Sequence, residues 1–246
     1  MRKARLQSSL YAWILLSSLR GLKLANPRRR VYFFDCESGE GVQWGDGITL
    51  IDAIPEKGAI GFAFKNTDQA LAFFENGKLS LTSMKGIVHI GDWFVFLRGL
   101  FSAKGKLGAK GWENLSDEKL VEKSKVAFFS AICGLEGLAR LDPFSKSLME
   151  ELPQGKLRIG LSGSEPFLTI AVRDGICVWG DQEVTPEDKS VDFLFKDAKS
   201  LWITVAGLGD NLAAVGRGTI QLRGYIPLAD GFNHMLDRLQ IFVKTG

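Results

Sequence analysis

Hydrophobic residues alternate with small or polar ones in two segments that lie far apart in the chain. In residues 59–65, Ile60, Phe62 and Phe64 fall on one side of an extended backbone. Residues 191–196 repeat this alternation, and each segment is followed by apolar residues with helical spacing. The pattern predicts two strands that each bury one face and each lead into a helix.

The rest of the chain gives further elements by the same criteria. Helices are predicted over residues 6–25, 66–77, 116–141, 143–151 and 201–208, and from Pro227 onwards. Strands are predicted over residues 31–38, 41–47, 86–92, 156–164, 167–181 and 219–224. Each half runs helix, antiparallel strands, helix, strand, helix. This order predicts an α+β fold in which helices cover one face of a mainly antiparallel sheet.

The two halves also resemble each other in sequence. Three pairs of segments recur 131 to 135 residues apart: 42–47 with 177–182, 59–74 with 190–205, and 85–92 with 217–224. A repeat of this length is usually one folding unit used twice, and 246 residues are enough for two such units. We therefore predict a first unit over residues 1–103, a linker rich in Gly and Lys over 104–115, and a second unit over 116–246.

Charge is unevenly distributed along the chain. The net charge is +3, but residues 1–30 hold eight Lys or Arg and no acid, which leaves the remaining residues at −5. A basic end on an acidic body favours a negatively charged partner. We expect peripheral contact with an anionic membrane through this basic N-terminus. We expect no nucleic-acid binding, because the acidic body carries no recognition motif.

Residues 10–22 are apolar and follow a basic start. A signal peptide or membrane anchor is one reading of this segment. A packed or interfacial helix is favoured, because the uninterrupted apolar core of residues 10–16 is far shorter than the roughly 20 residues that span a bilayer. We therefore expect a cytoplasmic protein, with peripheral membrane contact as the second location.

The residues with reactive side chains do not form a recognisable catalytic group. Cys36, Cys133 and Cys177 are far apart and none lies in a CxxC pair, which predicts reduced, buried thiols. His89 and His234 fall off the apolar faces and are expected at the surface. Neither histidine neighbours a cysteine, and no pair of carboxylates stands out. We therefore predict no enzyme activity, no cofactor and no metal site.

Residues 192–232 resemble the type-two sterol carrier protein family. The matching pieces are Phe195-Lys196-Asp197, Gly207, the turn 210–215, the strand 218–224 and Pro227-Leu228-Ala229. The resemblance covers about 148–243; residues 31–101 are less similar but keep Phe64-Lys65-Asn66 and the segment 86–92. It implies an apolar tunnel between a sheet and its helices, which binds sterols, fatty acids or fatty acyl-CoA without catalytic residues.

The resemblance leads to a specific functional hypothesis, the carriage of a hydrophobic lipid in the second unit. The expected lipid-contacting residues are Phe193, Phe195, Trp202, Val205, Ile220, Leu222, Phe232 and Met235. The alternative is an accessory scaffold for lipid or quinone metabolism, in which side chains fill the interiors and the apolar segment 93–101 binds a partner. A thioesterase-like hydrolase is a third hypothesis, with Cys36, Cys177 and His234 as its candidates.

Overall fold

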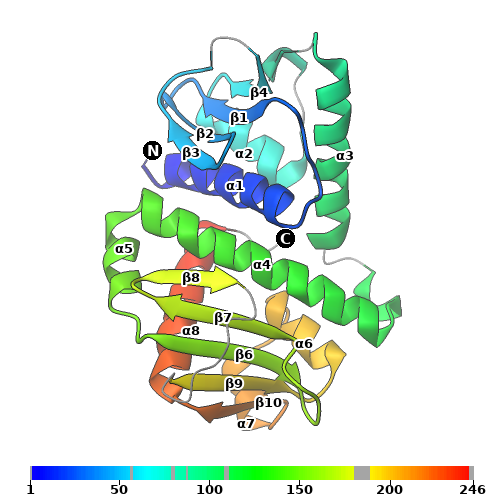
Figure 1. The fold of residues 1–246 in the computed structure, drawn as a ribbon, viewed down its shortest axis with the longest axis vertical. Helices are drawn as coiled ribbons and strands as arrows, with labels where there is room; N and C mark the ends of the chain where they lie inside the picture. The colour runs from blue at the N-terminus through cyan, green and yellow to red at the C-terminus, as the bar shows by residue number, and fades with distance from the viewer. Residues whose placement is uncertain are drawn as a thin grey trace. The chain divides into compact units, whose positions relative to one another are not determined.

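The computed structural model describes residues 2–55, 58–78, 81–86, 88–107, 111–179 and 189–243. The chain is a mixed α+β protein, as predicted, and it divides into two compact units, Met1–Lys106 and Leu107–Ile241. Each unit contains one five-stranded sheet (Figure 1). The division falls inside the segment expected to be a linker.

The first unit consists of one sheet and three helices. Its elements are α1 (Arg2–Gly21), β1 (Arg30–Asp35), β2 (Glu40–Trp44), β3 (Ile48–Ile51), β4 (Ala59–Phe64), α2 (Thr67–Asn76), the 3-10 turn η1 (Leu81–Ser83), β5 (Met84–Lys85) and α3 (Ile90–Leu107). The strand order is β3-β2-β1-β4-β5, and β1 and β4 are parallel while all other neighbours are antiparallel. Side chains of all three helices pack on one face of this sheet.

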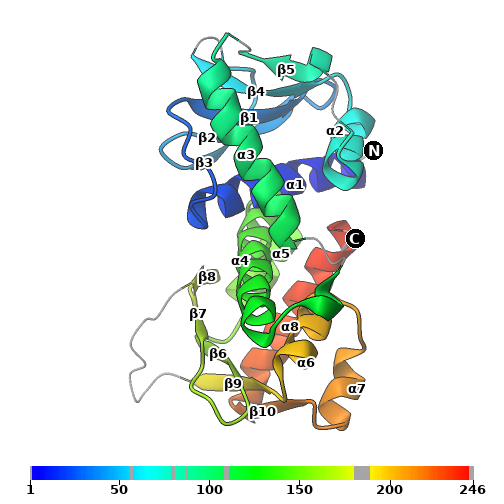
Figure 2. The same ribbon diagram turned by 90° about the vertical axis from the view of Figure 1, so that its right-hand side faces the viewer.

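The second unit has the same kind of layering. After the 3-10 turn η2 (Trp112–Asn114), its elements are α4 (Asp117–Leu141), α5 (Pro143–Glu150), β6 (Gly155–Leu161), β7 (Leu168–Arg173), β8 (Ile176–Trp179), β9 (Ser190–Phe195), α6 (Ala198–Val205), α7 (Asn211–Gly216), β10 (Ile220–Gly224) and α8 (Ile226–Phe242). The strand order is β10-β9-β6-β7-β8. Figure 2 shows the sheet edge-on with the helices on one side.

The two sheets have the same pairing scheme. In each, the first strand pairs antiparallel with the second and parallel with the fourth, and the fourth pairs antiparallel with the fifth. Phe62 lies between Phe33 and Met84 in the first sheet. Phe193 lies between Ile159 and Leu222 in the second. The positions of β4 and β9 therefore correspond with the predicted shift of 131 residues.

The helices that follow these two strands begin in the same way. The Asn66 side chain accepts a hydrogen bond from the Gln69 N–H at 2.9 Å, and the Asp197 side chain accepts one from the Ser200 N–H at 2.7 Å. Both residues cap the N-terminus of the helix, where backbone N–H groups have no helical partner. The predicted start of α2 is therefore confirmed.

The strand predicted over residues 86–92 is wrong. The fifth strand ends at Lys85 and a helix begins at Ile90, so that Val88 and Ile90 are 85% and 74% exposed instead of facing the core. The reason is that Trp93, Phe96 and Ala103 are spaced as on one side of a helix and are buried in the core. An alternation of two apolar residues is too short to distinguish a strand from the first turn of a helix.

Glycine ends the fifth strand in both units. Gly86 and Gly224 have φ angles of 71° and 106°, which residues with a side chain rarely adopt. A Cβ would lie 2.4 Å from the Ala59 carbonyl oxygen at Gly86, and 2.2 Å from the Ser190 carbonyl oxygen at Gly224. Gly86 therefore corresponds to Gly224, and the sequence repeat that matched 85–92 with 217–224 was out of register.

Aromatic rings fill the helix-facing side of the first sheet. The rings in mutual contact are those of Phe33, Phe62, Phe64, Phe73, Phe74, Trp93 and Phe96, with centroid separations from 4.9 to 6.4 Å. Trp13, Leu16 and Leu19 of α1 are buried in the same core. The apolar face of the N-terminal helix thus packs on the first sheet. Among the described residues, no helix is both long and apolar enough to cross a bilayer.

Candidate functional site

The eight residues expected to contact lipid all lie in the second unit, on two strands and two helices. Five of them are almost completely buried: Phe195, Trp202, Ile220, Phe232 and Met235. The other three, Phe193, Val205 and Leu222, are half-buried. Phe193 lies opposite Leu222 in the β9–β10 register, so these two side chains are neighbours on one face.

Trp202 occupies a different place from the other seven. It packs with Leu120 of α4 and with Ala198, and the Lys123 ammonium lies 4.9 Å from the centre of its ring. Burial lowers the pKa of Lys123 from its ordinary value, because the charged form loses part of its hydration. Trp202 therefore secures α6 against α4.

The helix-facing side of the second sheet carries smaller side chains than that of the first. Ile159 takes the position of Phe33, because both lie beside the corresponding residue of the fourth strand. Counted from the helix caps, Thr204 and Val205 take the positions of Phe73 and Phe74.

This difference in size coincides with a difference in burial. Phe62 is completely buried, whereas Phe193 in the corresponding position is half-buried. The second interior thus lacks three phenyl rings that the first interior contains. Its aromatic residue Phe193 is also partly exposed to water.

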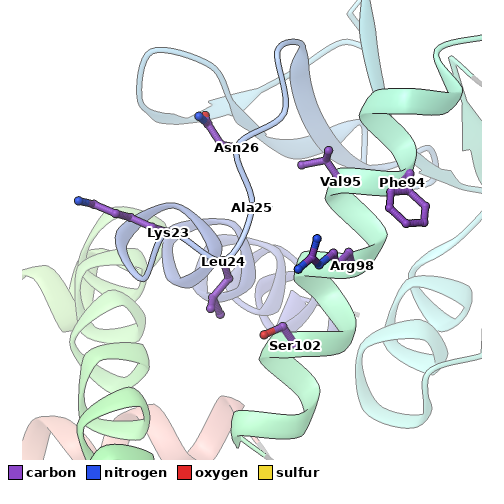
Figure 3. A pocket seen from close by; sticks show the side chains of 8 residues that line it. All are labelled: Lys23, Leu24, Ala25, Asn26, Phe94, Val95, Arg98 and Ser102. Carbon is purple, nitrogen blue, oxygen red and sulfur yellow. The ribbon is translucent and has the colours of Figure 1, made fainter.

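One hollow lies in the first unit. Its volume is about 300 Å³, and it is lined by Lys23, Leu24, Ala25, Asn26, Phe94, Val95, Arg98 and Ser102. Figure 3 shows Val95, Arg98 and Ser102 along one side of α3, next to the segment 23–26. A Cβ on Gly99 would lie 2.7 Å from the Ala25 Cβ, so the glycine lets this segment approach the helix closely. None of the eight predicted lipid-contacting residues lines this hollow.

A second hollow, of about 10 Å³, lies beside Asp35 and is too small for an organic ligand. The Asp35 carboxylate is buried but satisfied. It accepts hydrogen bonds from the Thr67 hydroxyl at 2.5 Å and from the Glu37 N–H at 3.0 Å. This arrangement joins the end of β1 to the start of α2, and sequence reasoning missed it because the two residues are 32 positions apart.

The cysteines differ from the prediction at one position. Cys133 and Cys177 are buried, as expected, but Cys36 is exposed, because β1 ends at Asp35 and Cys36 lies in the turn that follows. Burial raises the pKa of the Cys177 thiol to about 12, which keeps it protonated near neutral pH. A protonated buried thiol is a poor nucleophile.

In the part of the chain that the structure describes, neither histidine belongs to a group of potential metal ligands. His234 is exposed, and its Nε2 lies 3.8 Å from an Asp230 carboxylate oxygen one helical turn away. His89 is half-buried just before α3. Within the described ranges, no three His, Cys, Asp or Glu side chains come together in a way that could hold a metal ion.

One ionic cluster in the second unit holds α8 to the start of α5. The Asp142 carboxylate accepts hydrogen bonds from the Ser145 N–H at 3.1 Å and from the Arg238 guanidinium at 2.7 Å. Desolvation opposes ionisation here, but these hydrogen bonds prevail and lower the pKa of Asp142. Arg238 lies on the same helix as Phe232 and Met235, so the cluster fixes the helix that covers the predicted lipid site.

No protein-family model matches this chain, and no characterised protein is found to be similar to it. The resemblance to sterol carrier proteins therefore stays a prediction.

Proposed function

We propose that the chain consists of two copies of a sterol-carrier-like unit and that the second unit binds a hydrophobic lipid without catalysis. The lipid is a fatty acid, a fatty acyl-CoA or a sterol-like molecule. The single observation that carries the proposal is the replacement of three interior phenyl rings by Ile159, Thr204 and Val205, next to a half-buried Phe193. The common strand order and pairing of the two sheets support the duplication.

In this proposal the lipid chain lies between β9–β10 and the helices α6 and α8. Phe193, Val205 and Leu222 contact it, because they are the half-buried apolar residues of the predicted set. Transfer of a methylene group from water to an apolar site contributes about 0.8 kcal/mol. A chain of a dozen methylenes would thus gain on the order of 10 kcal/mol before the entropic cost of binding is subtracted.

The first unit has a different role in this proposal. Its interior is occupied by seven connected aromatic side chains, and the hollow that Phe33, Phe64 and Phe74 line has a volume of only about 10 Å³. Such packing stabilises a unit but does not suit a carrier. We therefore infer that the first unit is a structural partner, and that lipid exchange is confined to the second.

The proposal is tested by extracting natively purified protein and analysing the extract by lipid mass spectrometry, together with titration of a fluorescent fatty acid. The substitution Val205→Phe restores the phenyl ring found in the first unit and is expected to weaken fatty-acid binding at least tenfold. Val215→Phe, at a position on α7 that is 38% exposed, is the matched control and should leave binding unchanged. Absence of both co-purified lipid and fatty-acid binding in the unsubstituted protein would refute the proposal.

A further inference from the structure

One face of α3 carries apolar side chains that the fold leaves exposed. Ile90 is 74% exposed and Phe94 is 68% exposed, and Val88 just before the helix is 85% exposed. Ile90, Phe94 and Arg98 are four residues apart, so they form one stripe along the helix. The opposite side of α3 holds the buried residues Phe96 and Ala103. Surface helices usually place polar residues on the outward face, so this stripe requires another explanation.

Positive charges border this stripe. Arg98 continues it, and Lys23 lines the adjoining hollow together with Phe94 and Arg98. The Arg28 N–H donates a 3.0 Å hydrogen bond to the Asp92 carboxylate, which places Arg28 beside the first turn of α3. The side chains of Lys23, Arg28 and Arg98 are exposed, and none of them forms a salt bridge with a carboxylate among the described residues.

The one acidic side chain of this helix turn is already neutralised. Asp92 pairs with Arg29, whose Nε lies 3.4 Å from the carboxylate. The surface around the exposed apolar residues is therefore positive. The hollow of about 300 Å³ beside it brings Arg98 next to the Leu24–Ala25 segment, as Figure 3 shows. Lys23 and Arg98 in its lining attract anionic groups to this part of the surface.

We propose that this surface, formed by Val88, Ile90, Phe94 and Arg98 with Lys23 and Arg28, docks on a bilayer that contains anionic phospholipids. Ile90 and Phe94 enter the boundary between headgroups and acyl chains, and the three cations contact the headgroups. Apolar residues bordered by cations are the pattern of interfacial membrane contact. The apolar face of α1 is buried, so the membrane contact expected at the N-terminal helix moves to α3 and the segment before β1.

This inference uses residues of the first unit and stands whether or not the second unit carries lipid. Charge complementarity favours a lipid surface as the partner. A leaflet rich in phosphatidylserine presents many negative headgroups, which can contact Lys23, Arg28 and Arg98 at the same time. A second copy of this chain would bring the same three cations together and would be repelled.

The test is flotation of the full-length protein with phosphatidylcholine vesicles, with and without phosphatidylserine. Binding is expected only when phosphatidylserine is present, and it should weaken as salt increases. The double variant Ile90→Ser/Phe94→Ser should lose binding. Lys23→Gln/Arg98→Gln should bind about 25-fold more weakly, since each cation contributes about fivefold near an anionic membrane. Leu50→Ser, at a position 48% exposed on β3, is the control and should bind normally.

Three results would overturn the proposal. The first is no binding to phosphatidylserine vesicles, and the second is equal binding by the serine double variant and the unsubstituted protein. The third is that the unsubstituted protein binds no vesicles and has a higher molar mass by light scattering than the double variant, which would show that a second copy covers this surface. Circular dichroism of each variant confirms that these exposed substitutions leave the fold intact.

Discussion

Phe62 and Phe193 occupy corresponding positions in the two sheets, and truncating each to alanine compares how well the two interiors are filled. Phe62 is completely buried and contacts five other rings, those of Phe33, Phe64, Phe73, Trp93 and Phe96. Removal of such a side chain typically costs about 3–5 kcal/mol. Phe193 is only half-buried, so Phe193→Ala should cost about 1–2 kcal/mol.

Amide hydrogen exchange measured by mass spectrometry resolves the two sheets within one chain. Fluorescence would not, because each unit contains three tryptophans. Slowly exchanging amides of β1 and β4 should exchange roughly a hundredfold to several thousandfold faster in Phe62→Ala. Those of β6 and β9 should exchange only about 5- to 30-fold faster in Phe193→Ala.

The comparison carries its own control, since each variant leaves the other sheet unchanged. Equal acceleration in the two sheets would show that Phe193 is packed as tightly as Phe62. In that case the second interior is filled and the argument for a lipid site there fails.

Three further outcomes follow from the geometry. Cys36 should react with a thiol reagent as a single fast equivalent per chain, and a second fast thiol in the native protein would contradict the observed burial of the other two. Asp142→Asn should lower the free energy of unfolding by about 1–3 kcal/mol at neutral pH. Because the folded-state pKa of this carboxyl is lowered, the difference should be complete above about pH 4 and vanish as the pH falls further, which denaturant titrations at several pH values check. Gly86→Ala and Gly224→Ala should each cost about 1–3 kcal/mol in thermal unfolding, whereas Gly91→Ala, where a Cβ meets no atom within 4 Å, should have little effect.

Local chemistry made much of the fold predictable. The alternation at Ile60, Phe62 and Phe64 identified β4, because the period of a strand is fixed by its backbone. Asn66 marked the start of α2, because its side chain satisfies an N–H group that the helix leaves free. The strand alternation and the helix cap each depend only on residues a few positions apart, so they can be recognised in the sequence.

Several features were not predictable from local patterns. Strand β3 was missed, because residues 48–51 form an edge strand with a partly exposed, irregular pattern. The segment 86–92 was assigned to a strand, because two alternating apolar residues fit both structures. Cys36 was assigned to the core, because it falls inside the strand predicted over residues 31–38. The end of β1 one residue earlier is set by the turn at Asp35.

The sequence by itself determined the α+β class, the alternating faces of the central strands and several helix starts, because each follows from residues close together in the chain. Only the tertiary structure decided which apolar side chains are covered. Phe62 and Phe193 have the same local pattern, yet Phe62 is buried among five aromatic rings whereas Phe193 is half-buried beside Ile159 and Leu222. Burial depends on what distant segments bring to the same place, and for that reason the exposed face of α3 and the difference between the two interiors appear only in the folded chain.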